Sequence, residues 1–392
     1  MSNTQKKNVP ELRFPGFEGE WEEKKLESII KVNSGKDYKH LDKGDIPVYG
    51  TGGYMTSVSE PLSEIDAVGI GRKGTINKPY LLEAPFWTMD TLFYCTPKKE
   101  TDILFILSLF RKINWKVYDE STGVPSLSKQ TINKINRFVP TNKEQQKIGK
   151  FFSKLDRQIE LQEQKLELLQ QQKKGYMQKI FSQELRFKDE NGNDYPEWEN
   201  VMLQKVLKDK TEGIKRGPFG GALKKDIFVE SGYAVYEQRN AIYDISNFRY
   251  YINENKYKEM QSFSVQPNDI IMSCSGTIGR LALIPHNYTK GIINQALIRF
   301  RTNHKIRSEF FLIFMRSNQM QRKILEANPG SAITNLVPVK ELKLIPFPLP
   351  VKFEQDKISQ FIHIINRRIE QSEKKIESLK NRKQGFLQKL FV

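Results

Sequence analysis

Two stretches of the chain, at 144–181 and 354–391, share one spacing of apolar residues. In each, the apolar positions advance in steps of four and three, which is the a/d pattern of a helix that packs along a seam. The spacing predicts a central helix over 144–183 and a C-terminal helix over 351–392. The expected seam residues are Ile148, Phe152, Leu155, Ile159, Leu166 and Leu169 in the first helix, and Ile358, Ile362, Ile365, Ile369, Ile376 and Leu379 in the second.

The two stretches are also similar in sequence. Aligned without a gap, they are identical at 17 of 38 positions. Both interrupt the apolar seam at the same places, with Gln162 matched by Ser372 and Lys173 by Lys383. Because polar seam positions fix the register between partner helices, we expect the two helices to pair with each other. The alternative is that each helix packs only on its own globular domain.

The connection between the helices favours an antiparallel pair. The segment between them must leave the C-terminal end of the first helix and return to the N-terminal end of the second. These ends are neighbours in an antiparallel pair, whereas a parallel pair would force the segment to span the helices, a distance of about 50 Å. We therefore expect a pseudo-two-fold, dumbbell-like molecule with a globular domain at each end of a coiled coil.

A weaker repeat links the two globular halves. The letters "ELRF" and "EW" open both, at 11–14 and 20–21 and again at 184–187 and 197–198. Short β-type runs separated by Gly, Asn and Pro follow in each half. The expected fold class is α+β, with two mixed domains that have β-rich cores and are separated by the helices. The expected boundaries are 1–143 and 184–350 for the domains, and 144–183 and 351–392 for the helices.

Two further helix signals are common to both halves. Apolar runs from Thr101 and from Ser308 each predict a helix with an N-terminal cap, the second continuing through "SNQMQRKIL" at 317–325. Gly175 and Gly385 occupy matched positions inside the long helices. Since a mid-helix glycine costs roughly 1 kcal/mol relative to alanine, close approach of another backbone or a kink would explain the pair.

The charge of the chain narrows the class of partner. It has 392 residues and a formal net charge of +17, which suits binding to a polyanion, nucleic acid first, although a solvated basic surface is the alternative. Its two cysteines and four histidines form no ligand pattern, so no metal site or disulfide framework is expected. No apolar run approaches the ~20 residues of a membrane span, and a cytoplasmic protein without membrane contact is expected.

The sequence contains only weak matches to known catalytic motifs. No phosphate-binding GxxxxGK[ST] loop occurs. The tetrad "NKPY" at 77–80 resembles the NPPY of amino-methyltransferases but has Lys78 in place of proline. Asp269 with "ELK" at 341–343 could be arranged as a nuclease-like pattern, which is common by chance in a lysine-rich chain. We therefore expect no catalytic residue, metal or cofactor in this chain.

Polar and basic residues on glycine-flanked loops are the candidates for contact with DNA. Arg, Asn and Gln can read base edges, while Lys and Arg meet phosphates. A solvated turn or a strand-end cap is the alternative for each, and for Thr75 and Thr277 it is favoured. The candidates are Lys36, Lys39, His40, Tyr49, Arg72, Lys73, Thr75 and Asn77 in the first half, and Lys215, Arg216, Lys224, Lys225, Gln238, Arg239, Asn240, Ser275, Thr277, Arg280, Asn294 and Gln295 in the second.

These features together resemble the DNA-specificity subunits of type I restriction-modification enzymes. The resemblance rests on the "LRF…EW" openings, the "SGTIG" loop, the "P…EQ.KI" entry to each helix and the "G[YF][ML]QK[IL]F" helix ends. It covers essentially the whole chain. The first half departs from the pattern, with "RKGTIN" where the second half has "SGTIGR".

The resemblance implies a non-catalytic subunit that directs its partners. Two target-recognition domains would each read one half of a split, asymmetric DNA site, with an unread spacer set by the antiparallel coiled coil. Two methyltransferase subunits would dock on the chain and methylate adenine N6 with S-adenosylmethionine. Optional endonuclease and translocase subunits would use ATP and Mg²⁺ to move along unmodified DNA and cut it.

Two other functions compete with this interpretation. A stand-alone DNA-processing enzyme would cut or modify DNA without partners. An assembly scaffold would carry its basic charge only for solubility, and its DNA affinity would lack the steep salt dependence of phosphate contacts.

Overall fold

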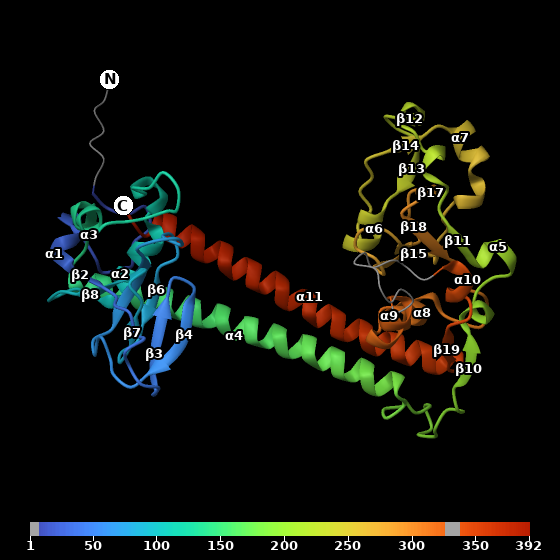
Figure 1. The fold of residues 1–392 in the computed structure, drawn as a ribbon, viewed down its shortest axis with the longest axis horizontal. Coiled ribbons are helices and arrows are strands. Elements are labelled where there is room, and N and C mark those ends of the chain that lie inside the picture. Colours follow the sequence, from blue (N-terminus) through green and yellow to red (C-terminus); the bar gives the residue numbers. More distant parts are fainter. Residues whose placement is uncertain (1–7, 326–337) are drawn as a thin grey trace. The chain divides into compact units, whose positions relative to one another are not determined.

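The computed structural model describes residues 8–325 and 338–392 and confirms the α+β class (Figure 1). The chain divides into two compact units, Met1–Leu166 with Gln371–Val392, and Glu167–Glu370. The divisions fall inside the two long helices, so each unit contains one globular half and a portion of both helices.

The described residues of the first unit form three small sheets. One is a four-stranded antiparallel sheet in the order β2-β8-β5-β6, one is three-stranded in the order β4-β3-β7, and the third pairs β1 with β9. The strands are β1 Glu22–Lys25, β2 Ile30–Ser34, β3 Ile46–Gly50, β4 Gly53–Val58, β5 Ala67–Gly71, β6 Tyr80–Leu82, β7 Trp87–Thr88, β8 Leu92–Pro97 and β9 Asn136–Val139. The helices are α1 Leu26–Ile29, α2 Ile103–Lys112, η1 Trp115–Tyr118, α3 Lys129–Lys134 and the first part of α4 Asn142–Phe181.

The second unit also contains three small sheets, in the orders β11-β18-β15-β16, β12-β14-β13-β17 and β10-β19. The strands are β10 Glu199–Met202, β11 Ile214–Arg216, β12 Phe228–Val229, β13 Tyr233–Tyr236, β14 Tyr251–Ile252, β15 Ile270–Ser273, β16 Leu281–Leu283, β17 Gly291–Ile293, β18 Leu297–Phe300 and β19 Pro346–Leu349. The helices are η2 Leu203–Val206, α5 Lys210–Gly213, η3 Gly220–Ala222, η4 Lys225–Ile227, α6 Gln238–Tyr243, α7 Glu254–Glu259, η5 Gln261–Phe263, α8 Ser308–Met315, α9 Asn318–Leu325, α10 Val339–Leu342 and the first part of α11 Lys352–Lys389.

The two units have corresponding sheets. The order β2-β8-β5-β6 returns as β11-β18-β15-β16, with every neighbouring pair antiparallel. The parallel pair β3 and β7 returns as β13 and β17. Between β13 and β15, β14 takes the place that β4 has beside β3, and the second unit adds α6, α7 and η5. The weak sequence repeat therefore marks a shared framework with different insertions.

Helices α4 and α11 pair antiparallel within each unit. In the first unit, the ring centroids of Phe151 and Phe386 are 5.0 Å apart, and Lys380 Nζ lies 2.6 Å from Glu163 Oε1. In the second unit, Tyr176 and Phe361 meet edge to face at 5.1 Å. Position along α11 falls as position along α4 rises, so the predicted orientation is confirmed.

The predicted seam is buried most fully toward the globular halves. Ile148, Phe152, Leu155 and Ile159 are buried in α4, and Ile358, Ile362, Ile365, Ile376 and Leu379 are buried in α11. Leu166, Leu169 and Ile369 are half-buried. Of the matched polar positions, Ser372 is buried and its hydroxyl has no hydrogen-bond partner among the described residues. Lys383 forms an ion pair with Asp156 of the other helix.

The matched glycines need neither of the expected explanations. A Cβ atom built on Gly175 or Gly385 meets no heavy atom of the described chain within 4 Å, so no other backbone approaches them closely. Both residues lie inside helices that the structure records as continuous. The described residues therefore leave room for a side chain at both positions.

The repeated sequence motifs form the same network in both units. Arg13 of the first "ELRF" donates two hydrogen bonds to Glu144, from Nε and Nη2, both 2.8 Å long. Arg186 of the second donates the same two bonds to Glu354, at 3.1 and 2.8 Å. Both carboxylates are buried, and both guanidinium groups have a raised pKa because of these hydrogen bonds. The motifs therefore join the start of each globular half to the helix that follows it.

The glutamine of each "EQ" pair holds the helix that closes the half. Gln145 Oε1 accepts a hydrogen bond from the backbone N–H of Asp102, and Gln355 Oε1 accepts one from that of Arg307. Their amide groups donate to the carbonyls of Pro140 and Pro350. The N-termini of α2 and α8 are thus fixed from outside those helices.

The expected caps differ from the observed ones. Helix α2 is capped by Asp102, one residue after Thr101, through a hydrogen bond from Phe105 N. At α8, Ser308 is the first helical residue and not the cap, and Arg307 makes no side-chain cap. The expected single helix is also interrupted, because α8 ends at Met315 and Ser317 Oγ accepts a bond from Met320 N at the start of α9.

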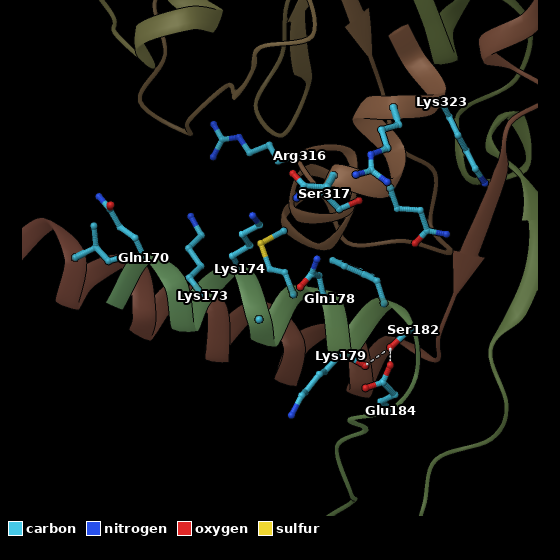
Figure 2. Close-up of a pocket in the computed structure, with 17 residues that line it drawn as sticks. Gln170, Lys173, Lys174, Gln178, Lys179, Ser182, Glu184, Arg316, Ser317 and Lys323 are labelled. Atoms are coloured by element: carbon cyan, nitrogen blue, oxygen red, sulfur yellow. Dashed lines mark hydrogen bonds between the residues drawn. The ribbon is translucent and has the colours of Figure 1, made fainter. Parts of the chain in front are cut away.

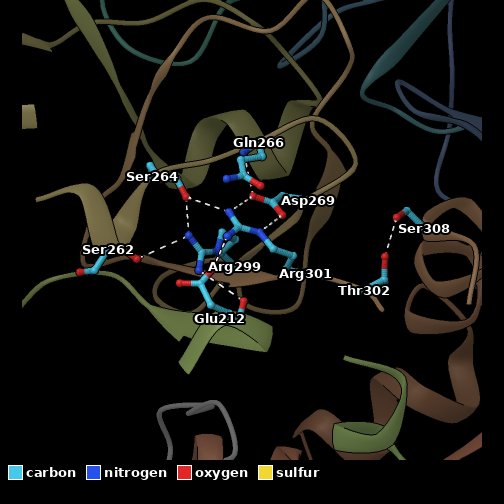
Figure 3. Close-up of polar contacts among 9 residues, drawn as sticks. All are labelled: Glu212, Ser262, Ser264, Gln266, Asp269, Arg299, Arg301, Thr302 and Ser308. Carbon is cyan, nitrogen blue, oxygen red and sulfur yellow. Dashed lines mark hydrogen bonds and ion pairs between the residues drawn. The ribbon is translucent and has the colours of Figure 1, made fainter. Parts of the chain in front are cut away.

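A buried ion cluster lies where the chain enters β15 and leaves β18 (Figure 3). Arg301 donates to both oxygens of Asp269, at 2.8 and 2.9 Å, and contacts Glu212. Arg299 lies beside it and donates to the carbonyl of Ser264. Burial and the charge of Arg301 lower the pKa of Arg299. Asp269 is thus held in an ion pair within the domain, which argues against a role in a nuclease-like site.

The described ranges, 8–325 and 338–392, contain no candidate membrane-spanning helix. No helix there is both long and apolar enough to span a bilayer.

Candidate nucleic-acid interface

One short turn brings the candidate loops of the first unit together. We call residues 88–91, between β7 and β8, the first hub. Thr88 O accepts a hydrogen bond from Lys36 N at 2.8 Å, and Met89 N donates to Tyr49 O at 2.9 Å. Arg72 N donates to Thr91 O at 2.8 Å. The loops that carry Lys36, Tyr49, Arg72 and Lys73 are therefore neighbours.

The second unit builds the same arrangement from different residues. We call residues 294–296, between β17 and β18, the second hub. Asn294 N donates to Tyr236 O at 2.9 Å, and Cys274 N donates to Ala296 O at 2.8 Å. These bonds place the loops of Gln238, Ser275 and Asn294 together, and Ser275 Oγ lies 3.3 Å from Gln238 Oε1.

A glycine is required beside each hub. A Cβ atom on Gly35 would lie 1.8 Å from Met89 O, and one on Gly217 would lie 1.8 Å from Asn294 O. Gly35 N donates to Leu92 O and Gly217 N to Leu297 O, at 3.0 and 2.9 Å. No side chain fits at either position, so the close approach of the two segments depends on glycine.

Most of the candidate side chains lie at the surface. Tyr49, Arg72, Thr75, Lys215, Gln238, Arg239 and Asn294 are half-buried. The exposed candidates are Lys36, Lys39, His40, Lys73, Asn77, Arg216, Lys224, Lys225, Ser275, Thr277, Arg280 and Gln295.

Asn240 differs from the other candidates. It is only 2% exposed, and its Oδ1 accepts a hydrogen bond from Glu237 N at 2.8 Å. Its amide group donates to the carbonyls of Ile245 and Asn247. These bonds complete the capping box of α6, so the structure gives Asn240 a structural role and corrects its selection as a DNA-contacting residue.

Several candidates are positioned by aromatic neighbours. The Nζ of Lys215 lies 4.7 Å from the ring centroid of Phe263, and the guanidinium of Arg72 lies 5.9 Å from that of Phe93. His40 meets Trp87 edge to face at 5.8 Å. Such contacts restrain the side chain, and a cation over a ring can still donate hydrogen bonds on the side turned away from the ring.

Lys129 is not among the candidates that the sequence suggests, but it lies beside three residues of the same surface. Together with Arg72, Lys73 and Ser34, it lines a hollow of about 400 Å³ in the first unit. Lys129 is the first residue of α3, and Ser128 caps that helix by accepting a bond from Thr131 N. In the sequence, the feature that could have marked Lys129 is its place directly after Ser128, a residue type that often caps a helix N-terminus.

The structure offers little chemistry at these positions beyond binding. Cys95 and Cys274 are buried, and burial raises the pKa of both thiols, partly countered at Cys274 by Arg216. Within residues 8–325 and 338–392, no group of three or more His, Cys, Asp or Glu side chains could hold a metal ion. The exposed groups at the hubs are hydrogen-bond donors, acceptors and cations, which suit contacts to base edges and phosphates.

Known proteins resemble this chain in sequence and in fold. The family model described as the type I restriction modification DNA specificity domain matches residues 18–171 and 220–381. The type I restriction enzyme MjaVIII specificity subunit of Methanocaldococcus jannaschii is 24% identical over 349 residues, which cover 84% of this chain and 76% of that protein.

Two solved structures share the fold over nearly the whole chain. The S subunit of a type I restriction-modification system from M. genitalium aligns over 98% of this chain and 99% of its own, with a TM-score of 0.63 and 15% identity. A chain solved in work on complex assembly and conformational transition of the type I R-M system aligns over 97% and 99%, with a TM-score of 0.58 and 14% identity.

Proposed function

The chain belongs to the type I restriction-modification DNA specificity family, and from this premise we propose that its two globular halves read the two parts of a split, asymmetric DNA site. Each half would contact one block of bases through its hub and the loops around it. As a specificity subunit, the chain would select the DNA on which partner subunits act.

The proposal rests on one observation. The two hubs share a backbone arrangement, but the side chains on that arrangement differ between the two halves. Tyr49 and Tyr236 accept the same hydrogen bond from their hubs. Elsewhere the corresponding residues differ. Met89 of the first hub corresponds to Asn294 of the second, and Lys36, which follows Gly35, corresponds to Pro218, which follows Gly217. Since sequence is read by side chains at base edges, two such sets on one framework would recognise two different blocks.

The paired helices would determine the unread spacer. Helix α4 has 40 residues and α11 has 38, so each extends about 55–60 Å at ~1.5 Å per residue. Two DNA-binding domains joined by helices of fixed length would favour DNA sites in which the two half-sites are separated by one particular distance. This role of the helices rests on their length and their antiparallel contacts in each unit.

We assign the catalytic steps to partner subunits. Two methyltransferase subunits would methylate adenine N6 with S-adenosylmethionine, and optional endonuclease subunits would use ATP and Mg²⁺ to translocate and cut DNA. This assignment rests on family membership. A stand-alone enzyme and a scaffold that only solubilises a complex are the functions it competes with.

Selection from a random duplex library by the full chain, bound to its methyltransferase subunits, tests the proposal. We expect enrichment of one motif with two specified blocks and an unspecified gap of constant length. A single contiguous block, or binding without enrichment, would contradict the proposal. DNA cleavage or methylation by the isolated chain would favour the stand-alone enzyme.

A further inference from the structure

A basic hollow of about 950 Å³ lies in the second unit, between the C-terminal turns of α4 and the corner where α8 meets α9 (Figure 2). Among the described residues, Glu184 is the single acidic residue in its lining, and it accepts a hydrogen bond from Ser182 Oγ. Figure 2 shows Lys173 and Lys174 projecting from α4 toward the side of Arg316, whereas Lys179 points away. The basic lining residues are Lys173, Lys174, Lys179, Arg316, Arg322 and Lys323.

Lys173 and Arg316 form a pair of cations with little compensation. Lys173 is half-buried, and burial together with the charge of Arg316 lowers its pKa. Among the residues that the structure describes, no carboxylate forms an ion pair with Lys173. Arg316 donates to the carbonyl of Leu281 at 2.5 Å, but its Nη2 lies 3.4 Å from Oδ2 of the exposed Asp244. Positive charge therefore accumulates at this end of the hollow.

The first unit has a hollow at the corresponding place, of about 430 Å³. In the helix repeat, Lys383 occupies the position of Lys173, and Ile159 that of Ile369. Arg111 follows the apolar run of α2 as Arg316 follows that of α8. Arg111, Lys383 and Ile159 all line the smaller hollow, as their counterparts line the larger one.

The two hollows differ in charge, because the lining of the smaller one includes Asp156, Glu160 and Glu163 as well as its basic residues. In the first unit, the carboxylate of Asp156 forms ion pairs with both Arg111 and Lys383 and so offsets part of their positive charge. The position of Asp156 in the repeat is taken by Asn366 in the second helix. The second unit therefore keeps both cations and has a neutral amide at the repeat position of the carboxylate, although Asn366 is not among the residues that line the larger hollow.

We propose that Lys173 and Arg316 hold a phosphate group of the DNA backbone in the second unit's hollow, at a site that the first unit has closed with Asp156. A phosphate oxygen can accept hydrogen bonds from an ammonium and a guanidinium at once, and it supplies the negative charge that Asp156 supplies in the other half. The inference rests on the proposed function, because it takes DNA as the source of the phosphate.

The hollow's position favours DNA over other phosphates. Helix α9 contacts the loop that carries Ser275 and Arg280, since a Cβ atom on Gly279 would lie 2.6 Å from Gln321 Oε1. Arg322 and Lys323 of the same helix line the hollow. The hollow is thus adjacent to the candidate interface, and a backbone that crosses the second hub has a short path to it. Such a contact positions the duplex without reading its sequence.

The test compares the full chain with the variants Asn366→Asp and Lys173→Gln, using the duplex selected for wild type and a scrambled duplex. Asn366→Asp installs the carboxylate of the other half at almost unchanged volume. We expect both variants to weaken binding to both duplexes by the same factor. The slope of log affinity against log salt should become shallower by about 0.9, the value for one phosphate contact.

Matched variants in the first unit provide the controls. Lys383→Gln removes a cation that already forms an ion pair with Asp156, so the salt slope should change much less than it does for Lys173→Gln. Asp156→Asn should remove this compensation from Arg111 and Lys383 and steepen the slope. Thermal unfolding of each variant shows whether a loss of binding comes from a loss of folding.

Three outcomes would overturn the inference, and they are distinguishable. If wild type binds the duplex and Asn366→Asp binds equally well with the same slope, this site alone fails. If inorganic pyrophosphate raises the melting temperature of wild type but not of Asn366→Asp, and DNA affinity is unchanged, the hollow takes free phosphate. If wild type binds no duplex at all, the proposed function fails together with the site.

Discussion

Single side chains at the hubs carry the proposed recognition of bases, and Gln295 offers a direct test. It is exposed at the centre of the second hub, and its carbonyl oxygen lies 3.6 Å from Cys274 Sγ. Replacing it with alanine removes a side chain suited to adenine but leaves the backbone bonds of the hub in place. We expect Gln295→Ala to lose about 1–3 kcal/mol of discrimination at one position of one block.

Binding to duplexes with single base substitutions in either block measures this effect. The other block should keep its full discrimination, because Gln295 belongs to one half only. An equal loss in both blocks, or no loss in either, would argue against base reading at the hub.

Glu354 is a test of the structural network at the same scale. It is buried and accepts hydrogen bonds from Arg186 and from Trp198 Nε1, the latter at 2.8 Å. Glu354→Ala should lower the free energy of unfolding by about 3–5 kcal/mol, because it leaves a guanidinium without its buried partner. Urea unfolding of the full chain measures the loss.

The equivalent variant Glu144→Ala serves as the comparison. Glu144 pairs with Arg13, but the indole Nε1 of Trp21 has no hydrogen-bond partner among the described residues. We therefore expect a loss of similar size but somewhat smaller. A change below about 1 kcal/mol in both variants would show that the network contributes little.

The candidate residues show what sequence can predict at this scale. Glycine-flanked loops with Lys, Arg and Gln were identified because loops lie at the surface. Asn240 looked the same in sequence, yet it completes the cap of α6, since asparagine suits both roles. Arg316 was missed because its significance depends on Lys173, which is distant in sequence.

At the scale of elements, the matched glycines should weaken the helix pair. A Cβ atom on Gly385 meets nothing within 4 Å in the described chain, and glycine costs roughly 1 kcal/mol in a helix interior. Gly385→Ala should therefore raise the free energy of unfolding of the isolated chain by up to about 1 kcal/mol. Thermal or urea unfolding measures it, and a destabilised variant would show that the site cannot accept a methyl group.

The long helices could be predicted because their apolar spacing persists over many turns and occurs twice. The caps and breaks of the shorter helices could not. Helix α8 ends where Ser317 caps α9, and a buried apolar run gives no periodic signal for that corner. The N-terminus of α8 is fixed by Gln355, which no local pattern around Ser308 reveals.

At the scale of the whole molecule, the proposed spacer predicts a change in the DNA site. One heptad inserted after Leu166 in α4 and one after Glu370 in α11 keeps the seam in phase and lengthens both helices by about 10 Å. We expect the preferred gap between the blocks to grow by about three base pairs, since B-DNA rises ~3.4 Å per pair. Selection from a random duplex library measures the gap.

A heptad inserted in only one helix is the matched control. It shifts the two seams against each other and should lower stability without producing a longer, well-defined gap. An unchanged gap in the double insertion would refute the role of the helices as a ruler, while leaving base reading by the two halves untouched.

The central claim is that this chain alone selects the DNA site through two different halves. The most direct measurement is single-molecule mapping of adenine methylation across a genome, in cells that keep the methyltransferase partner and either contain or lack this chain. The account predicts a split motif that appears only when the chain is present. Methylation that is the same with and without the chain would contradict it.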